Sequence, residues 1–248
     1  MIRVVFISFM VVSLAISCGK GNSSNQGYDL PQILQDDTLR VLTLNTSTSY
    51  FIYRDQPMGY HYDMITEFSR QYKLTPKIIV AKNSNSMIEM LKDGVADVIV
   101  YNMPVTNKMR DSVLYCGVQQ ISHQVLVQRV QHSDFMITDV TDLIGKKITV
   151  VKGSRFHDRI NNLNNELGGG IIIEDIGGDT TLVEDLIRMV SKGEIEYTIA
   201  DDDLATFNQT YFNNIDVHLP ISFDQRSSWI VRKDSPILAD SLNKWFEL

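Results

Sequence analysis

The chain has 248 residues, with 23 Lys and Arg against 30 Asp and Glu for a formal net charge of −7, and 44% of its residues are hydrophobic. These proportions are typical of a globular protein with a large core, and they exclude a disordered or low-complexity chain. The acidic balance argues against a nucleic-acid-binding surface, which needs clustered Lys and Arg to replace counterions.

The first residues have the features of a targeting signal. Arg3 precedes an apolar run at residues 4–16, and small residues then lead to Cys18. About thirteen apolar residues are too few for a helix that crosses a bilayer, which needs roughly 20, but they suit a secretory signal. Because residues 14–18 (LAISC) resemble a bacterial lipobox, we expect residues 1–17 to be a signal peptide and Cys18 to carry a lipid. A plain secreted or N-anchored protein is the alternative.

The region that follows is expected to act as a tether. Residues 19–27 (GKGNSSNQG) are small, polar and aperiodic, as in a flexible linker, and we assign residues 18–37 to the lipidated cysteine and its tether. Lipidation predicts a periplasm-facing protein anchored to the inner or outer membrane of a bacterium. It also leaves Cys116 without a disulfide partner, so we expect Cys116 to be a small buried hydrophobe.

From Leu39 onward, short apolar runs alternate with segments of helical period. Ile65, Phe68 and Tyr72, for example, have the i, i+3, i+7 spacing of one helix face. The expected strands are residues 39–44, 77–81, 95–100, 147–151, 171–174 and 197–200, with a further apolar run at 125–129, and the expected helices are residues 62–72, 86–92, 156–167 and 182–190. This alternation predicts an α/β fold with largely parallel sheets.

An internal repeat divides the chain into two similar halves. Residues 41–47 correspond to 148–154, and residues 87–102 correspond to 186–201, in the same order and at similar spacing. The alternative is that any two helix-glycine-strand units look alike. Two α/β lobes would leave a cleft between them, and ligands bind beyond the carboxyl ends of parallel strands. The polar or aromatic residues at those ends are the candidate ligand-binding residues Asn45, Tyr50, Asn102, Ser154, Arg155 and Asp201.

Several segments together resemble the family 3 extracellular solute-binding proteins. These are residues 39–68 (LRVLTLNTSTSYFIYRDQPMGYHYDMITEF), 90–100 (MLKDGVADVIV), 142–154 (DLIGKKITVVKGS) and 196–209 (EYTIADDDLATFNQ). Residues 45–63 and 197–217 are especially similar to the solute-binding domain of membrane-bound lytic murein transglycosylase F. Each motif is weak alone, but their number and order make the set specific.

The resemblance implies a two-lobed fold of the periplasmic-binding-protein type (type II) with a ligand cleft between the lobes. Residues 38–124 and 222–248 would form lobe 1, and residues 125–221 would form lobe 2. The chain would cross between the lobes near residues 125–129 and 221–228. It also implies a small-molecule ligand and no cofactor.

The resemblance further assigns roles to individual residues. Arg110 would hold a ligand carboxylate, Ser154 and its neighbouring N–H groups would assist, and Asp201 would hold a ligand ammonium group. The chain departs from the family pattern at Val105 and at residues 115–117, and these departures widen the expected ligand from a free amino acid to a peptide or a cell-wall fragment.

Each of these residues also has a structural explanation. Arg110 lies in a polar run, so it can be a surface cation with no role in ligand binding. Ser154 can cap the helix that follows it, which needs a cap with or without a ligand. Asp201 lies where a strand meets a helix, and an acidic side chain there would interact favourably with the helix dipole. Tyr50 can be an aromatic residue of the core.

The sequence contains no recognisable catalytic constellation. The transglycosylase resemblance implies a catalytic Glu followed by Ser, and no such dipeptide occurs. The five histidines show no metal-ligand spacing, so no metal site is expected. We therefore expect a binding protein that is not an enzyme. One alternative is a regulatory module of a lytic transglycosylase whose catalytic domain lies outside this sequence, and another is a transport component that delivers its ligand to a permease.

Overall fold

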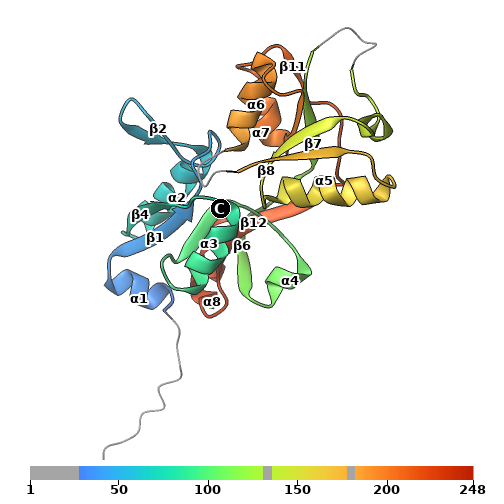
Figure 1. Cartoon of the computed structure of the whole chain (residues 1–248). Coiled ribbons are helices and arrows are strands. Elements are labelled where there is room, and N and C mark those ends of the chain that lie inside the picture. The colour runs from blue at the N-terminus through green and yellow to red at the C-terminus, as the bar shows by residue number, and fades with distance from the viewer. Residues whose placement is uncertain (1–27, 131–135, 178–181, 248) are drawn as a thin grey trace, which may run out of the picture.

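A computed structural model describes residues 28–130, 136–177 and 182–247. They form a mixed α/β fold with two lobes, each built on a five-stranded sheet (Figure 1). The proposed signal peptide, Cys18 and the first part of the tether lie outside the described residues. Among the described residues, no helix is both long and apolar enough to cross a membrane.

Lobe 1 has the strand order β4-β1-β5-β12-β6. Its strands are β1 (Thr38–Thr43), β4 (Thr75–Val80), β5 (Val98–Pro104), β6 (Val113–Ser122) and β12 (Gln225–Arg232), and its helices are α1 (Leu30–Gln35), α2 (Tyr60–Gln71), α3 (Ser84–Lys92), α4 (Asn107–Arg110) and α8 (Pro236–Phe246). A separate hairpin of β2 (Phe51–Tyr53) and β3 (Gln56–Met58) projects from this lobe (Figure 1).

Lobe 2 has the strand order β11-β7-β10-β8-β9. Its elements are β7 (Gln124–Arg129), η2 (Val140–Leu143), β8 (Lys147–Val151), α5 (Arg155–Glu166), β9 (Ile172–Ile176), α6 (Val183–Lys192), β10 (Tyr197–Asp201), α7 (Asp202–Gln209) and β11 (Ile215–Asp216). Read from β9, this order matches that of lobe 1 from β4, as the internal repeat predicts.

The sheets are mixed, which corrects the expectation of largely parallel sheets. In each lobe three neighbouring strands are parallel, and the next two are antiparallel to their neighbours. The antiparallel strands adjoin the points where the chain changes lobe. Because the chain enters and leaves each sheet there without a crossover helix, these strands need not run in the common direction.

Both faces of each sheet are buried. In lobe 1, Leu39 and Val41 of β1 face the core shared with α2 and α8, whereas Leu42 faces the core shared with α3. In lobe 2, Leu126 of β7 packs with α5, and its neighbour Val127 packs with α6. Burial of both faces explains why these strands read as nearly continuous apolar runs.

The two crossings between the lobes run side by side. The chain passes from β6 to β7 at His123, and the return crossing lies between β11 and β12. Ile221 donates its N–H to the carbonyl of Gln124 over 2.8 Å. The Nδ1 atom of His123 lies 3.3 Å from an oxygen of Asp224 on the other crossing. Residues 125–129, near which we expected the first crossing, instead lie inside the sheet of lobe 2 as part of β7.

Two boundaries also differ from the sequence-based expectation. The structured chain begins before residue 37, because α1 buries Leu30 and Ile33 in the core of lobe 1. The expected strand at residues 95–100 starts later and ends later, as β5, because Val95 is exposed in the turn after α3.

The first described residues are bound tightly to the end of lobe 1. The carboxylate of Asp29 accepts hydrogen bonds from the N–H groups of Leu30, Ile237 and Leu238, at 2.7, 2.9 and 2.9 Å. It therefore caps α1 and α8 together. The carbonyl of Tyr28 accepts from Arg232 and Ser235.

Candidate functional site

A cavity lies between the two lobes, at the carboxyl ends of the parallel strands. Lobe 1 contributes Leu44, Thr46, Tyr101 and residues 82–84 to its lining, and lobe 2 contributes Leu204 and residues 154–156 and 182–184. It encloses only about 70 Å³, which indicates that the lobes lie close together in this structure.

Three helix N-termini meet at this cavity. Asn83 caps α3 by accepting a hydrogen bond from the N–H of Ser86, and Ser154 caps α5 by accepting from the N–H of His157 over 3.2 Å. Leu182 precedes α6, and its N–H donates to the carboxylate of Asp185. A helix N-terminus carries a partial positive charge and unpaired N–H groups. The cavity is therefore suited to a ligand with an anionic group.

Two of the candidate residues form an ion pair beside the cavity. The guanidinium of Arg155 donates from Nη2 to Oδ2 of Asp201, which ends β10. The side chains are 21% and 10% exposed, so the pair is largely shielded from water. Arg155 also lies over the ring of Phe156, with 5.1 Å between its guanidinium carbon and the ring centroid.

One direct contact joins the lobes across the cleft. The N–H of Ser47, in the turn after β1, donates to Oε1 of Glu184 in the first turn of α6 over 2.9 Å, and the Ser47 hydroxyl donates to the same oxygen. Because Glu184 also lines the cavity, this contact joins lobe 1 to a ligand-facing segment of lobe 2.

We expect the change Glu184→Ala to open the lobes, because it removes both hydrogen bonds between Ser47 and α6. Small-angle X-ray scattering should show a larger radius of gyration for the variant than for the unaltered protein. Glu194→Ala is the control, since the Glu194 side chain is exposed and its carboxylate lies 3.9 Å from the ammonium group of Lys192 in the same lobe. Equal radii for all three proteins would contradict a role of this contact in holding the lobes together.

The structure brings together only some of the candidate residues. Ser154 and Arg155 line the cavity, and Asp201 reaches it through Arg155. Asn45 is exposed and forms a bridge to Tyr50, whose ring packs edge-on against Tyr62 at 5.5 Å. Neither Asn45 nor Tyr50 lines the cavity.

Asn102 and Arg110 also lie away from the cavity lining. Asn102 lies within β5 rather than at its end, and its amide donates to the side chain of Gln120 over 2.6 Å. Arg110 is exposed at the end of α4, and its carbonyl accepts from Lys233, which follows β12. Because β12 is antiparallel to β5, with Val231 opposite Val98, Lys233 lies beyond the amino end of β5 and not at its carboxyl end.

Other residues line the cavity without having been singled out from the sequence. Residues 82–84 follow β4, so the same strand-end rule predicts them once β4 is placed. Tyr101 of β5 and Thr46 lie within the strand-end segments to which the repeat points, although neither is among the candidates named above. Glu184 lies in the first turn of α6, and the sequence gives no local signal for it.

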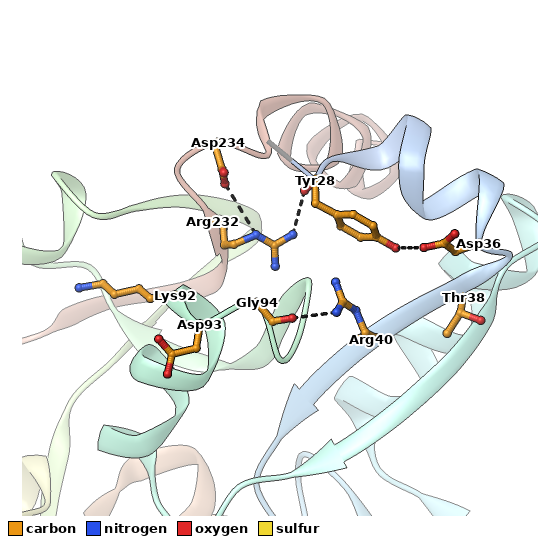
Figure 2. A pocket seen from close by; sticks show the side chains of 9 residues that line it. All are labelled: Tyr28, Asp36, Thr38, Arg40, Lys92, Asp93, Gly94, Arg232 and Asp234. Atoms are coloured by element: carbon orange, nitrogen blue, oxygen red, sulfur yellow. Dashed lines mark hydrogen bonds and ion pairs between the residues drawn. The ribbon is translucent and has the colours of Figure 1, made fainter. Parts of the chain in front are cut away.

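A larger cavity, of about 520 Å³, lies elsewhere, at the end of lobe 1 where the described chain begins. Figure 2 shows the guanidinium groups of Arg40 and Arg232 turned toward one another beside the ring of Tyr28. Both groups donate to Oδ1 of the buried Asp97, over 2.6 and 3.3 Å. Burial and a hydrogen bond to Asp36 raise the pKa of the Tyr28 hydroxyl to about 12. These charged groups satisfy one another, so we assign the cluster to the stability of lobe 1.

No group of three or more His, Cys, Asp or Glu side chains in the described part of the chain could hold a metal ion. Cys116, the one cysteine within it, is buried in the core of lobe 1. Burial raises the pKa of its thiol well above the ordinary value.

Comparison with known proteins places this geometry in context. The membrane-bound lytic murein transglycosylase F of Desulfosudis oleivorans is 29% identical over 220 residues, which are 87% of this chain and 46% of the relative. A protein of the same name from Pseudomonas fluorescens is 28% identical over 204 residues, 82% of this chain and 41% of the relative. The chain thus spans less than half the length of these relatives.

The fold is also shared with solved structures. The arginine-bound form of truncated ArgBP from T. maritima superimposes with a TM-score of 0.74 at 19% identity, covering 88% of this chain and 99% of that one. A histidine-bound ABC uptake transporter substrate-binding protein from Streptococcus pneumoniae gives a TM-score of 0.76 at 18% identity, covering 91% of each chain. The model of the bacterial extracellular solute-binding proteins, family 3, matches residues 39–248, and this chain therefore belongs to that family.

Proposed function

We propose that this protein binds a small amino-acid-like, peptide or muropeptide ligand between its two lobes, on the periplasmic side of a bacterial membrane to which a lipid on Cys18 anchors it. The observation that carries the proposal is the interlobe cavity, which both lobes line and at which three helix N-termini meet. Membership of an extracellular solute-binding family supports both the binding role and the location.

The proposed site is centred on Ser154, Arg155 and Asp201. Ser154 would position the free N–H groups of α5 against an anionic group of the ligand. Lobe 1, which we take as residues 38–124 and 222–248, and lobe 2, residues 125–221, would move about the paired crossings at His123 and Asp224. Closure of this kind is a hinge motion, in which a few residues between rigid bodies absorb the change.

Calorimetric titration tests this function. The folded protein, without its signal peptide, is titrated with a panel of amino acids, N-acetylated amino acids, short peptides and muropeptides. We expect heat from at least one class, with a stoichiometry of one ligand per chain. A protein that gives a folded circular-dichroism spectrum and no heat with any ligand would contradict the binding function.

A second candidate is a regulatory module of a lytic murein transglycosylase. It is favoured by the relatives of that name, which are more than twice as long as the segment matched here. On this proposal the chain itself binds and does not catalyse, and a partner domain cleaves the glycan. A coding region downstream that specifies a helix with Glu followed by Ser would favour this candidate, whereas adjoining permease and ATPase genes would favour a transport component.

A further inference from the structure

We propose that Arg155 determines which class of ligand the cleft binds. Because Arg155 is paired with the carboxylate of Asp201, the ligand carries a carboxylate but no free ammonium group, as in an N-acylated amino acid or peptide. This inference rests on the proposed binding function and names the chemistry of its ligand.

The carboxylates at the cleft are already engaged. Asp201 accepts from Arg155, and Glu184 accepts twice from Ser47 of the other lobe. The cavity lining also includes the cation Lys82. Asp203, in the first turn of α7, also lies close enough to Arg155 for their charges to interact, and its carboxylate accepts from the N–H of Leu204. The helix N-termini that meet at the cavity carry positive partial charge, which favours an anion there.

A ligand ammonium group placed against Asp201 would meet an unfavourable environment. It would lie within a few ångströms of the Arg155 guanidinium, and like charges at that separation repel strongly where water is largely excluded. The Asp201 side chain is only 10% exposed, so water screens this repulsion weakly. Displacing Arg155 instead would break a shielded, charge-assisted hydrogen bond.

A ligand carboxylate meets the opposite environment. A guanidinium has five N–H donors, and Asp201 accepts from one nitrogen of Arg155, so donors remain on the side chain that lines the cavity. The contact with Phe156 restricts the guanidinium plane. Ser154 begins α5 directly beside Arg155, so the N–H groups of that helix and the guanidinium can act on one anionic group.

Matched ligand pairs test the inference by calorimetry. L-alanine is compared with N-acetyl-L-alanine, and L-glutamate with N-acetyl-L-glutamate, so that the members of a pair differ only in the amine. We expect the unaltered protein to bind the acetylated member roughly tenfold or more tightly than the free amino acid, as expected when a like charge is avoided in a shielded site.

The change Arg155→Gln should reverse this preference. It uncovers Asp201 while keeping a polar side chain of similar length, so the free amino acid should gain roughly tenfold or more relative to its acetylated partner. The double variant Arg155→Gln with Asp201→Asn should lose that gain. Arg188→Gln is the matched control, because it removes the same charge from an exposed pair with Asp185 on α6. This variant should prefer the acetylated ligand as the unaltered protein does.

A second variant keeps the test decisive if Arg155→Gln fails to fold. Asp201→Asn leaves Arg155 without its partner, and binding of the acetylated ligand should be kept or strengthened. An unaltered protein that binds free amino acids as well as or better than acetylated ones would overturn this inference and leave the binding function intact. Absence of heat from both members of every pair, together with silence from the wider panel, would instead contradict the binding function itself.

Discussion

Replacing Asp97 with alanine is expected to lower the free energy of unfolding by about 3–5 kcal/mol, the usual cost of removing one partner from a buried ion pair. The Asp97 side chain is 0% exposed and accepts hydrogen bonds from the main-chain N–H, Nε and Nη2 of Arg40 and from Nη2 of Arg232. The variant would leave both guanidinium groups without this counter-charge, and Arg232 is itself only 10% exposed.

Urea-induced unfolding at neutral pH, followed by circular dichroism, measures this loss. Glu67→Ala is the control, because it also removes a carboxylate paired with an arginine, but both side chains of that pair are at least half exposed. We expect little change for the control, since exposed pairs contribute little to stability. A loss below about 1 kcal/mol for Asp97→Ala would contradict the role of the cluster as a stabilising centre of lobe 1.

Acidification should destabilise the protein through His61. This side chain is only 3% exposed and lies 5.7 Å from the ring of Trp229. Burial lowers its pKa from 6.5 to about 4, and a hydrogen bond with the backbone of Val100 opposes that shift only in part. Between these two pH values the unfolded chain binds a proton that the folded chain does not, so the free energy of unfolding falls as the pH falls. The shift corresponds to about 3 kcal/mol.

Comparison with His61→Phe isolates this contribution. Carboxylates also titrate in this range, so the quantity to measure is the difference in unfolding free energy between the variant and the unaltered protein, at pH 7 and at pH 4. We expect this difference to change by about 3 kcal/mol in favour of the variant as the pH falls. His218→Gln, at a side chain that is 82% exposed, should show no comparable change. A difference for His61→Phe that is independent of pH would contradict burial of a neutral imidazole.

Local sequence pattern predicts the parallel half of each lobe. Leu186, Ile187 and Val190 recur at helical spacing and are buried on one face of α6, which ends at Gly193 in the left-handed conformation as its sequence suggests. Local pattern cannot predict the direction of β12, because that direction depends on strands that are distant in the sequence. Trp229 of β12, for example, pairs with Cys116 of β6, more than one hundred residues earlier. Local pattern does not predict α1 for the same reason, because Asp29, which caps this helix, also accepts hydrogen bonds from the distant helix α8.

The candidate site was predictable only in part, and for a related reason. The strand-end rule identifies Ser154, Arg155 and Asp201 as neighbours of a cleft. It does not reveal that Arg155 and Asp201 bind one another. These residues are 46 positions apart in the sequence, and they come together only because β8 and β10 are neighbouring strands. It also includes Asn102 wrongly among strand-end residues, since β5 continues to Pro104.

The attachment of Tyr28 and Asp29 to β12 and α8 determines how the protein would bear a mechanical load. A pull on the chain upstream of Tyr28 would pass through Arg232, Ser235 and the start of α8 into the central strands of lobe 1. The crossing at Asp224 adjoins the opposite end of β12 from Arg232, so on the proposed anchoring a pull would enter lobe 1 at the end of this strand that lies away from the hinge. If the proposed anchor and hinge motion hold, the tether and the cleft would thus act on opposite ends of the same strand.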